Sequence, residues 1–144
     1  MFEQGKLVEA KFAIQYPLVR PATREEDIAL HFDGVFLIYG REEKVDIKGH
    51  RSVNRGDAAG EYAWVELINV RGDKGWLLGE ADIVAFAYYE DFILVRREEL
   101  LAFTLKTLQV KAAKEPYCLY RRYGRKDLII MIPYSELQKM HYVK

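Results

Sequence analysis

The chain has 144 residues, half of them hydrophobic, with 22 basic and 22 acidic side chains and a formal net charge of zero. This length and composition predict one domain with a substantial core, and they exclude a disordered acidic or basic tail. Binding to nucleic acid through bulk charge needs a basic protein, so any such binding must here use a local basic patch.

Cysteine content and hydropathy indicate the cellular compartment in which the protein is expected. The single cysteine, Cys118, cannot form an intramolecular disulfide, which suits the cytoplasm, and its apolar surroundings predict a packed thiol. No apolar run approaches the ~18 residues that a membrane helix needs. The first residues also lack the basic and then apolar pattern of a signal peptide. We therefore expect a cytoplasmic protein with no membrane partner.

A helix is predicted over residues 6–16, where Val8, Phe12 and Tyr16 recur at four-residue spacing before Pro17. Glu9 borders the buried side of this helix. It can be a solvated helix glutamate or part of a functional site. After the helix, residues 23–26 match a capping box, with threonine first and glutamate three residues later, and predict a short helix or turn.

Residues 32–49 predict a β-hairpin around which the rest of the chain is organised. Asp33 opens an apolar run, and the second strand carries Asp46 and Lys48 on one face because side chains alternate along a strand. A turn at residues 39–40 places Asp33 opposite Asp46, whereas a turn at residues 41–42 places it opposite His50. Only the first register brings the carboxylates together, since opposed side chains lie ~4.5–5.5 Å apart.

The remaining elements alternate between strands and helices. A polar loop is predicted over 50–61, a strand over 62–70, a turn over 72–75, one helical turn within 76–81 and two wholly apolar strands over 83–89 and 92–96. A helix over 97–109, a hairpin over 117–123 and 127–132, and a final helix opened by a capping box at 135–138 follow.

These elements predict an α+β fold, with a mixed β-sheet flanked by helices. We expect one domain over residues 1–144. Its core occupies about residues 1–110, and the C-terminal hairpin and short helix add residues 116–144.

The acidic residues of the hairpin predict a metal centre. Two close carboxylates repel each other unless a cation or a proton lies between them, and oxygen ligands suit Mg²⁺ or Mn²⁺. Lys48 is placed to orient a water molecule or to stabilise a phosphorane-like transition state. Glu9 is a candidate to complete the cluster, and Glu66, on an otherwise apolar strand face, is a reserve candidate.

A helix with Glu9, then Asp33, then Asp46-Ile47-Lys48 resembles the PD-(D/E)xK phosphodiesterase superfamily, which includes restriction enzymes, Holliday-junction resolvases and phage nucleases. The resemblance covers roughly residues 1–100. It implies a restriction-endonuclease-like core of a helix, three strands, another helix and a further strand. It also implies that Asp33 and Asp46 bind metal, that Lys48 is the catalytic lysine and that Glu9 is the helix glutamate of the family.

The chain departs from the family pattern at two places. Phe32 stands where the family has proline, and a long segment separates Lys48 from the next strand. The stretches 64–70, 75–79 and 81–82 also resemble small phage proteins of nuclease type.

The best basic patch surrounds the turn at Gly124, with tyrosines interleaved. It is either a phosphate-binding surface for the substrate or a solvated hairpin tip. The patch consists of Arg121, Arg122, Arg125 and Lys126.

These features predict a metal-dependent endonuclease that hydrolyses phosphodiester bonds, with DNA favoured over RNA. A homodimer is expected if the substrate is a duplex or a junction, because two strands need two sites. The alternative is a catalytically inactive module of the same fold that contacts nucleic acid or a partner protein. A phage-encoded inhibitor of a host defence belongs to this second class.

Overall fold

The computed structural model describes residues 2–49, 61–111 and 113–142. Residues 50–60 of the loop predicted over 50–61, His50 among them, lie outside the described residues. Across the described ranges, no helix is long and apolar enough to cross a membrane.

The predicted N-terminal helix is confirmed, although it begins earlier than residue 6, and the strand that follows it was not predicted. Helix α1 (Phe2–Gln15) stops before Pro17 and is followed by strand β1 (Leu18–Pro21) and one short helical turn, η1 (Glu26–Leu30). The predicted capping box is formed: Glu26 N donates to Thr23 Oγ1 at 3.1 Å, and Thr23 N donates to Glu26 Oε1 at 2.9 Å. Arg20 also pairs with the Glu26 carboxylate, which ties η1 to β1.

The main sheet has five strands in the order β1-β2-β3-β5-β6. Its remaining strands are β2 (Gly34–Ile38), β3 (Arg41–Lys48), β5 (Ile83–Tyr88) and β6 (Asp91–Arg96). Strands β3 and β5 are parallel, and the other neighbours are antiparallel. The predicted α+β class with a mixed sheet flanked by helices is confirmed.

A second, two-stranded sheet pairs β4 (Tyr62–Ile68) with β7 (Leu128–Pro133). Near it lie the single helical turn η3 (Trp76–Leu78) and the helices α2 (Arg97–Thr107) and α3 (Tyr134–Met140). The predicted hairpin of 117–123 with 127–132 was wrong in its main pairing, because β7 forms its ladder with β4. From the first arm, Tyr120 pairs with Ile129 in an isolated bridge. Helix α3 begins one residue before Ser135, so the predicted capping box there was also wrong.

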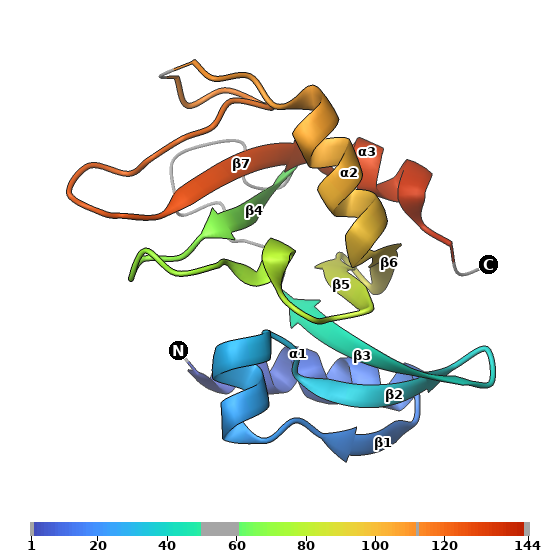
Figure 1. The fold of residues 1–144 in the computed structure, drawn as a ribbon. Coiled ribbons are helices and arrows are strands. Elements are labelled where there is room, and N and C mark those ends of the chain that lie inside the picture. Colours follow the sequence, from blue (N-terminus) through green and yellow to red (C-terminus); the bar gives the residue numbers. More distant parts are fainter. Residues whose placement is uncertain (1, 50–60, 112, 143–144) are drawn as a thin grey trace.

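In the five-stranded sheet, both faces of β5 and β6 are buried over most of their length. Phe12 of α1 packs with Val45 and Ile83 on one face, whereas Val84 and Val95 belong to the core formed with β4, β7, α2 and α3. Figure 1 shows α1 on one side of β3 and the β4–β7 sheet on the other. Burial on both faces explains why β5 and β6 are apolar throughout instead of alternating.

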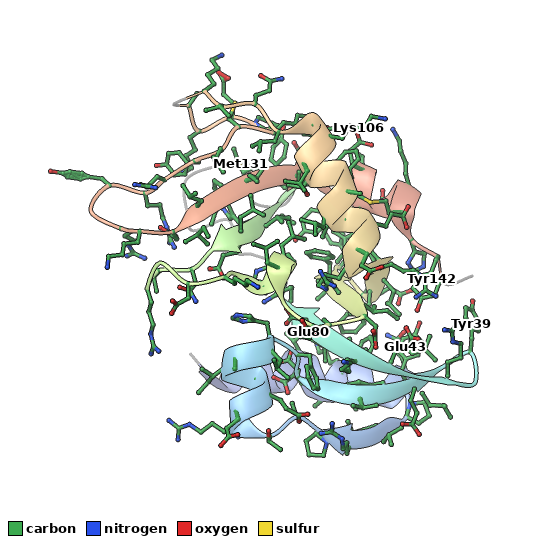
Figure 2. The ribbon with its side chains drawn as sticks, in the orientation of Figure 1. Tyr39, Glu43, Glu80, Lys106, Met131 and Tyr142 are labelled. Carbon is green, nitrogen blue, oxygen red and sulfur yellow. The ribbon has the colours of Figure 1, made fainter. Side chains whose placement is uncertain are left out.

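The C-terminal residues close the outer edge of β6. Leu94 N donates to His141 Nδ1 at 2.9 Å, and Tyr142 N donates to Leu94 O at 3.3 Å. Tyr142 then packs edge-on against Tyr39 of the β2–β3 turn, with ring centroids 6.4 Å apart. Figure 2 shows Tyr39, Glu43 and Tyr142 at this end of the hairpin. Polar groups at a free strand edge are thus satisfied within the chain.

Gly75 allows the turn after β4 to pack closely. A Cβ at this position would lie 2.5 Å from the Glu66 carbonyl oxygen, while its own N–H donates to Leu67 O. We predict that Gly75→Ala lowers the free energy of unfolding by at least ~2 kcal/mol, because the backbone must move.

Urea unfolding would measure this change. Gly40→Ala is the matched control. A Cβ there meets no atom within 4 Å, and its φ of +73° leaves only the conformational penalty, which is ~1–2 kcal/mol. If Gly75→Ala proves no more destabilising than Gly40→Ala, the close approach does not constrain the fold.

Candidate active site

The β2–β3 turn sets the geometry of the site. Gly34 pairs with Val45 and Ile38 pairs with Arg41, which leaves Tyr39 and Gly40 as a two-residue turn. Both turn residues have positive φ, +52° and +73°, as a type I′ hairpin turn requires. Continued by one residue, this register sets Asp33 opposite Asp46. The first of the two predicted registers is therefore confirmed.

The two aspartates meet where β2 begins and β3 approaches its end. Asp33 N donates to Val45 O at 2.8 Å, and Asp33 Oδ2 accepts a hydrogen bond from Ile47 N at 2.7 Å. Asp46 is only 5% exposed, and its charge acts on the Asp33 carboxyl group. The pair therefore forms a compact acidic centre that the hairpin backbone holds in place.

Burial and mutual repulsion favour the protonated state of this pair. Burial first, and then the charge of Asp46, raises the pKa of Asp33 to about 7 against the opposing effects of Ile47 N–H and Lys48. Burial likewise raises the pKa of Asp46, although the Lys48 ammonium opposes this shift. At neutral pH the two carboxyl groups therefore hold a proton that a bound cation would displace.

Lys48 lies between Asp46 and the indole of Trp76. Its Nζ is 3.3 Å from Asp46 Oδ2, close enough for an ion pair, and 4.7 Å from the centroid of the Trp76 ring. The same Asp46 oxygen is buried and has no hydrogen bond of good geometry. A cation–π contact and an ion pair together hold the Lys48 ammonium in place. They leave Asp46 Oδ2 without a well-placed hydrogen-bond donor.

Trp76 reaches this position because the segment after β4 packs against the residues before Asp33. His31 Nε2 donates to Lys74 O at 3.0 Å, and Glu80 N donates to Leu30 O at 2.8 Å. Trp76 itself is buried and packs edge-on against Phe86, the register partner of Lys48. Trp76 is thus a core residue that also contacts the candidate lysine, a contact that no local sequence pattern indicates.

The other predicted acids lie farther from the aspartate pair. Helix α1 covers the Val45 face of β3, opposite the face that carries Asp46. The pKa of Glu9 is raised by partial burial first and then by the charge of Asp33, which places Glu9 within electrostatic reach. Glu66 lies on β4, in the other sheet. Among the residues that the structure describes, no three His, Cys, Asp or Glu side chains form a group that could hold a metal ion.

The predicted basic patch is divided between a structural and an exposed part. Arg122 Nε donates to Asp127 Oδ2 at 2.9 Å, and its guanidinium forms an ion pair with this fully buried carboxylate. Leaving such a charge unpaired typically costs ~3–5 kcal/mol, so Arg122 primarily supports the fold. Arg121, Arg125 and Lys126 are exposed around the same turn.

No family model matches the chain, and neither the curated proteins nor the solved structures give a match. The order of elements agrees with the resemblance noted above through β3. Then β4 of the second sheet and η3 precede β5, and α2 follows β6. Membership of the PD-(D/E)xK superfamily stays a prediction.

Asp33 should make stability depend on pH in a characteristic way. Its carboxyl has a pKa of about 7 in the folded state and ~3.9 when unfolded. The folded state therefore binds the extra proton between these values, and this group's contribution to stability is lost as the pH rises through 7. Asparagine cannot ionise and retains an acceptor for Ile47 N. We predict that the free energy of unfolding of Asp33→Asn, measured relative to that of wild type, increases by ~2 kcal/mol from pH 5 to pH 8.

Urea unfolding of both proteins at the two pH values measures this difference. Asp82→Asn is a useful comparison, because Asp82 also accepts a hydrogen bond from a β3 amide, that of Lys44, but lies exposed. An Asp33→Asn effect that is the same at pH 5 and pH 8 would contradict the raised pKa.

Proposed function

We propose that the protein is a divalent-metal-dependent nuclease that hydrolyses phosphodiester bonds, with DNA as the favoured substrate. The observation that supports this proposal is the placement of Asp33, Asp46 and Lys48 on one face at the end of a hairpin. Two carboxylates and an ammonium are the groups that phosphodiester hydrolysis with a metal ion uses.

The residues present fit a divalent cation. Asp46 has a buried oxygen without a well-formed hydrogen bond, and Asp33 has a strongly raised pKa, both of which an added positive charge would relieve. Asp33 and Asp46 would hold the ion. When bound, a Mg²⁺ or Mn²⁺ ion neutralises phosphate charge and makes a water molecule more acidic.

The chain itself supplies orientation and a second positive charge. The Ile47 amide fixes the Asp33 carboxylate through its 2.7 Å hydrogen bond. Lys48, held between Asp46 and Trp76, presents an ammonium that would stabilise the charge developing on the phosphate oxygens. Glu9 on α1 is near enough for the charge of Asp33 to raise its pKa, so it would add negative charge beside the ion.

A second candidate is a catalytically inactive module that binds nucleic acid or a partner protein. The ion pair of Lys48 with Asp46 favours it, because this pair partly neutralises the acidic centre without any metal. A duplex or branched substrate would call for a homodimer in either case, since two strands present two contact points.

Cutting assays separate the two candidates. With Mg²⁺ or Mn²⁺, the wild-type protein should cleave DNA, and Asp46→Ala or Lys48→Ala should lower the rate ~10²–10³-fold. Binding measured in EDTA should persist, because both changes remove groups needed in the transition state. The substrates to test are duplex, single-stranded and branched DNA, with RNA in parallel.

Glu42→Ala and Lys106→Ala are matched controls, since they remove one acid near the β2–β3 turn and one lysine on α2, both at exposed positions. Both should cut like wild type. If wild type shows no divalent-dependent cutting on any of these substrates, the nuclease proposal fails and the inactive module stands.

The affinity of the aspartate pair for a metal ion should depend on pH. A cation at the pair must displace the proton that Asp33 holds with a pKa of about 7. Mn²⁺ binding should therefore be about tenfold tighter at pH 8 than at pH 6. Isothermal titration calorimetry can measure it, with Asp33→Asn as the variant that should lose both the affinity and its pH dependence. Equal affinity at the two pH values would argue against binding at this pair.

A further inference from the structure

Two turns project from the same end of the β4–β7 sheet. Strand β4 ends at Ile68, which pairs with Leu128 at the beginning of β7. The turn that follows β4 (residues 69–75) and the turn that precedes β7 (residues 121–127) must therefore leave the sheet together, as Figure 1 shows. A Cβ on Gly72 would lie 3.3 Å from Lys126 Cδ, so the turns are in direct contact.

These turns concentrate positive charge in a chain that is neutral overall. They contain six basic and two acidic residues, whereas the whole chain has 22 of each. One of the two acids, Asp127, is fully buried and paired with Arg122, which leaves Asp73 as the exposed acid. The exposed cations are Arg71, Lys74, Arg121, Arg125 and Lys126. We call them the turn surface.

Hydrogen bonds hold both turns in defined conformations. Asn69 Oδ1 accepts hydrogen bonds from Arg71 N at 2.9 Å and from Asp73 N at 3.0 Å. In the other turn, Arg122 is fixed on Asp127, and Tyr120 exchanges backbone hydrogen bonds with Ile129. Ordered turns lose little conformational freedom when they bind, which favours recognition of an extended polyanion.

An aromatic ring stands at the tip of the turn surface. Tyr123 is 93% exposed, next to Gly124, whose φ of +74° makes the reversal. A tyrosine this exposed gains little from packing within the chain. Exposed rings flanked by cations are the arrangement that proteins use to stack on unpaired bases while binding the adjacent phosphates.

The first of these turns is linked to the residues around the candidate active site. Lys74 O accepts a hydrogen bond from His31, two residues before Asp33, and Trp76, two residues after Lys74, lies against Lys48. The position of this turn is therefore coupled to that of the acidic centre.

From this arrangement we propose that the turn surface binds a single-stranded segment of the nucleic acid, with the cations on its phosphates and Tyr123 stacked on an unpaired base. The inference rests on the proposed nuclease function for its role in substrate placement. The substrates selected would be those with unpaired nucleotides, such as flaps, overhangs or junctions, in place of uninterrupted duplex.

Fluorescence anisotropy in EDTA tests the surface without cutting. The probes are a labelled oligothymidylate of about 20 nucleotides and a duplex of the same length. Arg125→Ala/Lys126→Ala should weaken binding to both probes at least tenfold and reduce the salt slope for the single strand by ~1.4. Tyr123→Ala should weaken the single strand by ~5–100-fold, since one stacked base contributes ~1–3 kcal/mol. Duplex affinity should not change, and Tyr123→Phe should bind like wild type.

Lys11→Ala/Lys106→Ala is the matched control, because it removes the same charge from exposed positions on α1 and α2. Wild-type affinity in Arg125→Ala/Lys126→Ala, or equal losses on both probes in Tyr123→Ala, would overturn the proposal. The two proposals fail separately. Binding at this surface without divalent-dependent cutting refutes the nuclease. Cutting of a flapped substrate that both Arg125→Ala/Lys126→Ala and Tyr123→Ala leave unchanged refutes the turn surface.

Discussion

The register of the β2–β3 hairpin is the constraint on which the site depends. A two-residue turn at Tyr39-Gly40 pairs Gly34 with Val45, and this pairing sets the two aspartates opposite each other. A slip of one residue would move every side chain of β3 to the other face of the sheet, placing Asp46 against α1. Tyr39 adopts a φ of +52°, which costs free energy for a residue with a side chain. Its ring contact with Tyr142 ties the turn to the C-terminal residues that close β6.

The same register buries carboxyl groups at a position where their charged form is unfavourable. Asp46 is a buried carboxyl group. Burial, together with the charge of Asp46, raises the pKa of Asp33 to about 7. The cost is tolerated because the surrounding strands are buried on both faces and are tightly packed. A centre that is unfavourable without a partner and held rigidly by backbone hydrogen bonds is the arrangement expected where function, not stability, selects the residues.

Sequence patterns predicted the local features well, because their causes are local. Period-two alternation placed Asp46 and Lys48 on one face, and the Thr23–Glu26 capping box formed as expected. The choice between two hairpin registers stayed open, since both turns were plausible from their residues alone. The parallel β3–β5 pairing, the β4–β7 sheet and the contact of Trp76 with Lys48 depend on residues far apart in sequence. The pairing of Arg122 with a buried Asp127 likewise needed burial to be known, because the sequence shows only a basic turn.

The distribution of charge fits the proposed action of a neutral chain on a polyanion. Its acidic centre at Asp33 and Asp46 lies at the end of the hairpin, and burial and the charge of Asp46 raise the pKa of Asp33 to about 7. Its cations are exposed on turns that contact the residues around that centre. A phosphate backbone approaching the turns would therefore meet positive potential first, and would meet the carboxylates only where Lys48 lies beside them. Under the proposed function, separation of the two signs, not net charge, would make binding and hydrolysis of nucleic acid compatible in one chain.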